Sequence, residues 1–453
     1  MRLKKYQQLL VSGKQLLIDL FIEKNFASIL IALVFLIFSI SYFESFRWVF
    51  PGPKATHGFA KALSLVLFGL MLLDKKKNQY LVTNNLVFLL FLSSFFLSAA
   101  FSLDLASSLL HLWYPLMATL IFFVLSRVKI EKKHLYLFLF LSIAFIFLTF
   151  TFSFFSIIFR YSVDNIYYFL FLDHRLIFAL EEIRQYGKYV SIGPYIILFP
   201  LTTVFLVEKK ASINQKILSY FMILITILTA VISNNRIDVL VIALHFLCFA
   251  FLFSRKIFVS LLLPAMLIAA FGLLVTQTYF GFNLEERILR PQLERDKETI
   301  DMRYTYWQTA LNNFRHFPIF GTGGNTYNTV SDFPIRRYYS DGTMQYTFKV
   351  DHGIGIHNVF IERLADTGLY GLITFLLLLA VFIKHDFMAL TQLFYKGDNK
   401  ESFKKYFLFS LSSWTWILYG ITDNGYGAQG FMTFFFIRGL LPHIYKLYYD
   451  EKV

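Results

Sequence analysis

Long apolar runs recur along the chain and constrain its fold more than any other feature of the sequence. Most are close to the length of about 20 residues that an α-helix needs to cross a bilayer. Only 16% of the residues are charged, whereas soluble domains carry about a quarter. The sequence therefore predicts an all-α polytopic membrane protein with about twelve transmembrane helices. The runs occupy residues 25–43, 58–73, 82–101, 106–126, 135–159, 190–207, 217–233, 238–254, 257–279, 361–383, 406–421 and 430–446.

Basic residues give the chain a formal net charge of +14, and their positions argue against nucleic-acid binding. They cluster after alternate apolar runs, as basic residues do in cytoplasmic loops of membrane proteins. If every run spans the membrane, both chain ends lie in the cytoplasm, and residues 160–189 and 280–357 lie on the opposite face. The clusters are Lys75–Lys77, Arg127–Lys133, Lys209 with Lys210 and Lys216, Arg255 with Lys256, and Lys384–Lys405.

This alternation divides the chain into five parts. Residues 1–24 form a basic, cytoplasmic N-terminus, and residues 25–279 hold the first nine predicted transmembrane helices. A large, partly helical polar loop follows at residues 280–357. The last three predicted helices lie within residues 358–446, and residues 447–453 form a cytoplasmic tail. A polar loop of this length in so apolar a chain predicts a functional role for residues 280–357.

The apolar runs contain most of the 56 phenylalanines, which we expect to contact lipid. Cys248, the only cysteine, lies in one of these runs, so the sequence excludes a disulfide framework and a cysteine metal site. His245 lies in the same run and has no obvious partner in the sequence. We therefore expect His245 to be a buried histidine with a satisfied hydrogen bond.

The large polar loop contains two patterns that point to a binding site. Arg303 and Trp307 are one turn apart on a predicted helix, so the aromatic ring could hold the guanidinium against an anion. Gly321, Gly323 and Gly324 predict a turn, because glycine adopts positive φ and permits close backbone approach. The turn lacks the lysine and hydroxyl residue that end a phosphate-binding P-loop, so it resembles such a loop only weakly.

Further polar positions flank this loop in the sequence. Arg236 lies in a short hairpin between two runs, where a permanent charge is a candidate for ligand binding and a structural pair with Asp238 is the alternative. Arg184 and Lys188 could form a cationic rim for an anionic ligand. Alternatively, they are ordinary interfacial residues whose charged ends extend toward water and bind nothing. Residues 331–352 are rich in tyrosine and predict a mobile loop that contacts sugars.

His357 stands where the polar loop returns to an apolar run, and Asn358 follows it. An imidazole titrates near neutral pH and can take a proton from an acceptor hydroxyl, so His357 is the candidate general base. A metal site with His352 and Asp351 is the less favoured alternative, because their spacing matches no usual ligand motif. Further along the run, Gly368 and Gly371 predict close packing of a second helix.

Together these residues resemble the O-antigen ligase and O-antigen polymerase superfamily of bacterial polytopic membrane proteins. The resemblance covers roughly residues 230–375, and its His-Asn, nine residues, Gly-x-x-Gly pattern is most similar to the ligase branch. It rests on Arg236 in the outer hairpin, Arg303 with Trp307 before the glycine turn, and His357 with Asn358 before Gly368 and Gly371.

The resemblance implies a GT-C-like, metal-independent and inverting glycosyltransferase in the bacterial inner membrane, with a periplasmic active site and no cofactor. Its donor would be a glycan on undecaprenyl pyrophosphate, and its acceptor a hydroxyl of lipid A-core. His357 would be the base, and Arg236 and Arg303 would bind the pyrophosphate, with Arg184 and Lys188 as further contacts.

Three other functions compete with the ligase. A polymerase would share the donor, use a second lipid-linked repeat as acceptor, and work with a chain-length regulator. A transporter of lipid-linked sugars predicts charges deep within several spans and an internal repeat, neither of which is clear in the sequence. A scaffold without catalytic activity would not explain a charged Arg236 at the membrane boundary.

Overall fold

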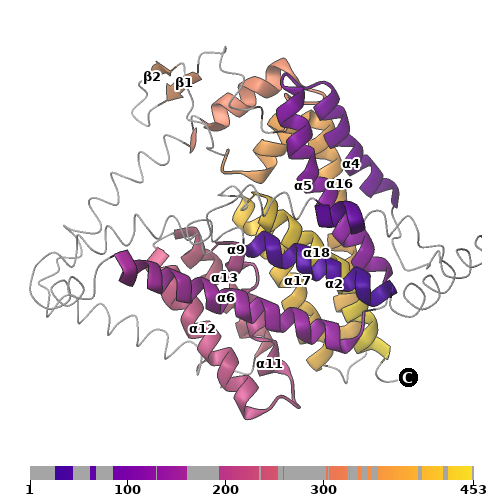
Figure 1. Cartoon of the computed structure of the whole chain (residues 1–453), viewed down its shortest axis with the longest axis vertical. Helices are drawn as coiled ribbons and strands as arrows, with labels where there is room; N and C mark the ends of the chain where they lie inside the picture. Colours follow the sequence, from indigo (N-terminus) through magenta and orange to yellow (C-terminus); the bar gives the residue numbers. More distant parts are fainter. Residues whose placement is uncertain are drawn as a thin grey trace, which may run out of the picture.

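The part of the chain that the structure describes is helical, apart from turns and one short β-hairpin (Figure 1). The predicted class, an α-helical polytopic membrane protein, is confirmed. The computed structural model describes residues 26–43, 62–67, 85–128, 130–160, 193–233, 236–253, 259, 303–304, 306–324, 326, 335–338, 344–347, 356–395, 400–421 and 427–450. The longer helices are α2 (Phe26–Phe43), α4 (Asn85–Ala100), α5 (Leu105–Arg127), α6 (Lys132–Arg160), α12 (Ile213–Ser233), α13 (Arg236–Leu252), α16 (Val359–Tyr395), α17 (Lys400–Gly420) and α18 (Gly427–Asp450).

Among the described residues, three helical stretches are long and apolar enough to cross a membrane. They are Leu105–Ser126, Lys132–Thr151 and Val359–Tyr395. Shorter apolar helices cover Ser28–Ile40, Leu86–Ala100, Ile213–Ile227 and Leu240–Ala250. The predicted run at 257–279 lies almost entirely outside the described residues, so the total of about twelve spans stays a prediction.

The single helix predicted for residues 190–207 is wrong, because this segment folds into short pieces. They are α9 (Gly193–Ile196), α10 (Phe199–Thr202) and α11 (Val204–Val207). Pro200 is the second residue of α10 and has no N–H to continue an α-helical ladder. The N–H groups of Leu201 and Thr203 instead bond three residues back, as in a 3₁₀ turn.

Phenylalanine side chains fill much of the space between the helices. Phe38 is fully buried, and its ring centroid lies 4.4 Å from that of Phe436 and 5.7 Å from that of Phe138. These rings join α2, α18 and α6. The expectation that phenylalanines mainly contact lipid therefore fails for the interior of the bundle. Glycine brings two helices closer still, since a Cβ at Gly439 of α18 would lie 2.8 Å from Leu125 of α5.

An ion pair is buried where α16, α17 and α18 meet. Arg438 Nη1 lies 2.7 Å from Asp386 Oδ2, and the two side chains are only 2% and 8% exposed. Ser410 and Trp414 donate further hydrogen bonds to the same carboxylate oxygen, at 2.6 and 2.7 Å. The Arg438 guanidinium also lies 4.3 Å from the centre of the Trp414 ring. This cluster connects three helices through one carboxylate.

A second ionic cluster marks one end of the bundle. Lys405 Nζ lies 2.7 Å from Glu401 and 3.3 Å from Glu208, and Tyr136 donates to Glu208 at 2.8 Å. Lys405 belongs to a predicted cytoplasmic basic cluster, yet it is only 4% exposed. The two carboxylates offset the cost of burying its charge.

Residues 331–352, for which the sequence predicted no regular element, contain a β-hairpin. Strand β1 (Ile335–Tyr338) pairs antiparallel with β2 (Met344–Thr347). Ile335 lies opposite Thr347, and Tyr338 lies opposite Met344. In Figure 1 the hairpin lies apart from the long helices. It is a local addition to a helical fold.

Candidate functional site

The predicted glycine turn is joined to a break in helix α16. At Gly368 the backbone leaves helical geometry, with φ 65° and ψ −166°. On one side of the break, the N–H groups of Thr322 and Gly323 donate to the carbonyls of Ala365 and Asp366 at 3.0 and 3.1 Å. On the other side, the N–H groups of Leu369 and Tyr370 donate to the carbonyls of Pro318 and Ile319 at 2.8 and 3.2 Å. The turn thus satisfies backbone groups that a broken helix would leave unpaired.

The glycines are required by this junction. Gly321 and Gly323 have φ values of 71° and 101°, which confirms the predicted positive φ. A Cβ at Gly321 would lie 2.4 Å from the backbone of Asp366, and a Cβ at Gly368 would lie 2.3 Å from the carbonyl oxygen of Ile319. The backbones of the glycine turn and of α16 therefore approach each other too closely for any side chain at these two positions.

The predicted role of Gly368 and Gly371 in packing a second helix stays a prediction, and the structure shows a further role for each. Gly368 supplies a positive φ at the break in α16. A Cβ at Gly371 would lie 1.8 Å from the hydroxyl oxygen of Thr367, within the same element. Thr367 uses that hydroxyl to donate to the carbonyl of Arg363 at 2.7 Å.

The start of α5 is fixed against the same turn. The N–H of Leu103 donates to the carbonyl of Thr322 at 3.2 Å, and the Ser102 hydroxyl donates to that carbonyl at 3.0 Å. Asp104 caps α5 by accepting hydrogen bonds from the hydroxyl and the N–H of Ser107, at 2.6 and 3.1 Å. These bonds hold the pKa of the Asp104 carboxyl below its usual value, the hydroxyl bond having the larger effect. The first turn of α5 therefore has a defined position beside the break in α16.

Residues 306–316 form a helix that contacts the approach to α16. The indole N–H of Trp307 donates to the carbonyl of Ile356 at 2.9 Å. The Tyr306 ring lies nearly parallel to the His357 imidazole, with 6.4 Å between centroids. Trp307, predicted as a supporting residue, thus positions the backbone immediately before His357.

His357 and Asn358 lie immediately before α16, which begins at Val359. His357 has φ 55°, an uncommon value for a residue other than glycine, and its side chain is partly exposed. Asn358 caps the helix by accepting from the N–H groups of Phe360 and Ile361, each at 3.0 Å, and its amide donates to the carbonyl of Ile421 at 2.8 Å. Asn358 therefore links the start of α16 to the end of α17 and fixes the backbone that carries the imidazole.

Arg363 is a charged residue of this region that the sequence reasoning missed. Its Nη2 lies 3.1 Å from Glu362 Oε1, and its side chain is 10% exposed. Its guanidinium lies 5.1 Å from the centre of the Phe95 ring on α4. Glu362 also lies within electrostatic range of His357. A charged pair inside a predicted transmembrane run, five residues after His357, was the available sequence signal.

Arg303 lies three residues before Tyr306, whose ring faces His357. It is one turn before Tyr306 and Trp307, so all three fall on one side of a helix. Its side chain is partly buried, and its Nε has no hydrogen-bond partner among the described residues. A buried donor of this kind is available to an anion.

The other predicted anion-binding residues are less fully described. Arg236 is the first residue of α13, but its side chain is outside the described part. Helices α12 and α17 both begin near the ionic cluster of Glu208 and Lys405, and both pack on α10 and α11. Each has 21 residues and is therefore about 30 Å long. The start of α13 and the end of α17 at Ile421 therefore lie toward the same end of the bundle. Asn358 binds Ile421 there.

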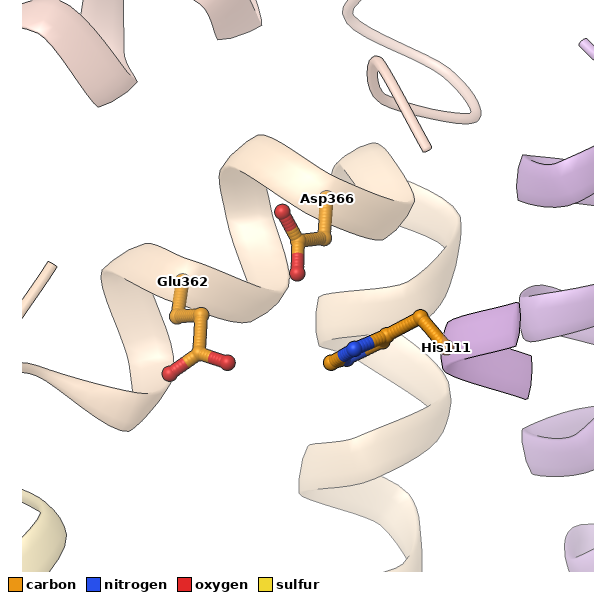
Figure 2. Close-up of side chains that lie close together, drawn as sticks. All are labelled: His111, Glu362 and Asp366. Atoms are coloured by element: carbon orange, nitrogen blue, oxygen red, sulfur yellow. The ribbon is translucent and has the colours of Figure 1, made fainter. Parts of the chain in front are cut away.

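Arg184 and Lys188 lie outside the described residues, as do His352 and Asp351 of the alternative metal site. The structure instead gathers a different set of metal-binding side chains, His111 of α5 with Glu362 and Asp366 of α16 (Figure 2). One potential ligand atom from each lies within 4.8 Å of the others. A search for ligand spacing along the sequence could not have found this set, because α5 and α16 are far apart in the chain.

His245 is buried, as the sequence predicted, and one of its ring nitrogens is satisfied, whereas Nδ1 has no hydrogen-bond partner among the described residues. It is fully buried, and its Nε2 lies 2.7 Å from the Thr415 hydroxyl. Cys248 is a free thiol in α13, as predicted. Neither residue contributes to the site around His357.

Comparison with known proteins agrees with the resemblance seen in the sequence. The family model described as O-antigen ligase matches residues 221–376, about a third of the chain. The matched stretch includes Arg236, Arg303, the glycine turn, His357 and the break in α16. Comparison with individual curated proteins gives no match. The match supports similarity of residues 221–376 to the O-antigen ligase and polymerase superfamily, and it does not separate the two branches.

Proposed function

We propose that the protein is an O-antigen ligase that transfers a glycan from undecaprenyl pyrophosphate to a hydroxyl of lipid A-core. The observation that carries this proposal is the position of His357 at a fixed helix start, stacked near Tyr306 on the helical segment that also bears Arg303. The similarity of residues 221–376 to the superfamily supports the same class of reaction.

In the proposed reaction, His357 removes the proton from the acceptor hydroxyl. The hydroxyl oxygen then forms a bond to the anomeric carbon, and the bond from that carbon to the pyrophosphate oxygen breaks. The electron pair leaves with undecaprenyl pyrophosphate, and attack from the opposite side inverts the anomeric centre. A pyrophosphate is already a good leaving group, so the reaction needs no ATP and no cofactor.

The cationic residues have a separate role in this proposal. Arg236 and Arg303 bind the pyrophosphate and stabilise the charge that develops as it leaves, with Arg184 and Lys188 as further contacts. Trp307 and Asn358 hold the backbone on either side of His357. Gly321, Gly323, Gly324, Gly368 and Gly371 support the junction between the turn and α16.

The proposal assigns a location to each of the five parts of the chain. The protein lies in the bacterial inner membrane with residues 1–24 and 447–453 in the cytoplasm. Residues 25–279 and 358–446 hold the membrane helices, and the loop at 280–357 carries the periplasmic active site. This arrangement gives access to both lipid-linked substrates from the outer leaflet.

A transfer assay with purified protein tests the role of His357. The donor is an undecaprenyl-pyrophosphate glycan and the acceptor is purified lipid A-core. We expect His357→Gln to lower kcat by roughly 10²–10⁴-fold, the range for loss of a general base. His316→Gln is the matched control, because His316 is an exposed histidine on the neighbouring helix and is expected to leave transfer unchanged. Full activity of a folded His357→Gln variant would remove His357 as the base.

The superfamily match leaves a polymerase as the second candidate function. It would join one lipid-linked repeat to another and act with a chain-length regulator. Supplying either lipid A-core or a second lipid-linked repeat as the sole acceptor separates the two enzymes. Movement of the donor across vesicles without a new glycosidic bond would instead support a transporter.

A further inference from the structure

We propose that His111, Glu362 and Asp366 bind a divalent transition-metal ion that joins α5 to the first half of α16. This inference goes beyond the proposed transferase function, which assigns no role to His111 and routes no step through a metal. Figure 2 shows the two carboxylates projecting from one helix toward the imidazole of the other. The three potential ligand atoms lie within 4.8 Å of one another.

The two carboxylates are placed by the helix that carries them. Glu362 and Asp366 are four residues apart, so they share one face of the first half of α16, just before the break at Gly368. Asp366 is 3% exposed, and the Glu362 side chain is 22% exposed. Two carboxylates so close together and so little hydrated need positive charge nearby.

Arg363 supplies positive charge to one side of this cluster. Its Nη2 contacts Oε1 of Glu362, and a carboxylate can use its second oxygen for another partner. A divalent ion at the cluster would place positive charge between both carboxylates and would also use the imidazole.

His111 is held in place by contacts from two sides. A Cβ at Gly324 would lie 2.5 Å from Cδ2 of His111, so the absence of a side chain at Gly324 makes room for the ring. The Tyr114 ring lies on the same helix, with 5.8 Å between the two ring centroids. Metal sites in proteins depend on such fixed ligand orientation. The glycine turn, α5 and α16 therefore converge on one ring.

The chemistry of the three ligands favours a particular class of ion. Carboxylate oxygens alone suit Mg²⁺ and Ca²⁺, whereas imidazole adds preference for zinc and its first-row neighbours. Ligand atoms of one zinc ion are about 4 Å apart or less, given bond lengths of about 2.0–2.2 Å. The observed limit of 4.8 Å is within reach of this value through small side-chain rotations. Water would complete the coordination.

Bound there, the ion would be structural. It would fix the helical turn that begins five residues after His357 against α5, and so help to hold the imidazole in place. A proton shared between the two carboxylates is the competing way to relieve their repulsion.

Metal binding to the full-length protein tests the inference directly. The protein is purified in detergent, freed of any affinity tag, stripped with a chelator and dialysed against Zn²⁺ or Mn²⁺. We expect about one ion per chain, and an increase in Tm when the ion is restored. The Mn²⁺ form should show nitrogen coupling in pulsed electron paramagnetic resonance, and His111→Ala should abolish that coupling.

Conservative variants separate metal binding from folding. Asp366→Asn and Glu362→Gln should each weaken binding by at least about tenfold. In the stripped protein, the Tm of Asp366→Asn should be no lower than that of the wild type, because it removes one of two crowded negative charges and leaves the pair of Glu362 with Arg363 intact. His316→Ala should bind the ion normally. A folded wild-type protein that binds no ion would overturn the inference. Binding by both His111→Ala and Asp366→Asn that is as tight as that of the wild type would overturn it as well.

The outcome is independent of the transfer reaction. His357→Gln, which is expected to lose transfer, should still bind the ion with wild-type affinity. If the wild-type protein binds no ion but His357→Gln still abolishes transfer, the metal proposal fails and the transferase proposal stands. If the protein binds the ion but His357→Gln keeps full transfer activity, the role of His357 fails and the metal proposal stands.

Discussion

At the scale of single residues, the break in α16 depends on a glycine that no side chain can replace. At Gly368 the φ is positive, and a Cβ would lie 2.3 Å from a backbone oxygen. We expect Gly368→Ala to destabilise the protein by about 1–3 kcal/mol from backbone strain, with the clash in addition. Thermal unfolding of the purified protein in detergent measures this loss.

Gly371 provides the matched comparison, because the atom that a Cβ would meet there belongs to a side chain. Gly371→Ala should also lower Tm, since its Cβ would lie 1.8 Å from the Thr367 hydroxyl oxygen. Adding Thr367→Gly removes both that oxygen and the Thr367 Cβ, which would lie 2.2 Å from the new methyl group, and should restore most of the loss relative to Thr367→Gly alone. The same second substitution should not help Gly368→Ala. Equal rescue of both variants would contradict the assignment of the Gly368 clash to backbone.

The sequence predicted the residues of this region unevenly, and the reason is physical. The positive φ of Gly321 and Gly323 was predictable, because three glycines within four residues are a local signature of a turn. The partners of His111 were not, because Glu362 and Asp366 are far from it in the sequence and reach it only through packing of α5 and α16. Arg363 was overlooked because it lies in a predicted transmembrane run, although the adjacent Glu362 was a signal of charge there.

At the scale of elements, the junction of α16, α17 and α18 depends on the pair formed by Asp386 and Arg438. We expect Asp386→Ala to cost about 3–5 kcal/mol, because it leaves the Arg438 charge buried without its partner. The double variant Asp386→Leu with Arg438→Met should lose less, since it removes both charges. Thermal unfolding of the single and double variants measures the two losses of stability. A single variant as stable as the wild type would mean that the pair does not hold these helices together.

The same elements show what apolar runs can and cannot predict. The run at 361–383 predicted the presence of α16 but neither its break at Gly368 nor its continuation to Tyr395. Hydropathy registers where a helix meets lipid, whereas Asp386 is charged and satisfied by neighbouring helices. The run at 190–207 failed as one helix because hydropathy does not register the N–H that proline lacks.

At the scale of the whole molecule, the alternation of basic clusters makes a prediction about sidedness. On a Cys248→Ala background, a single cysteine at Arg315 or at Lys210 can be labelled with a membrane-impermeant maleimide; both positions are exposed. We expect Arg315→Cys to react after only the outer membrane is permeabilised. Lys210→Cys should react only after the inner membrane is opened as well. Labelling of both positions from the same side would overturn the proposed topology.

The shared hydrogen bonds between residues 318–323 and α16 also have a consequence for engineering. Residues 318–323 and α16 are joined through main-chain hydrogen bonds, so neither can be exchanged without the other. A chimera that imports the large loop from a homologous enzyme must import the kinked helix with it. Grafts cut between the two should misassemble even when every side chain proposed for catalysis is retained.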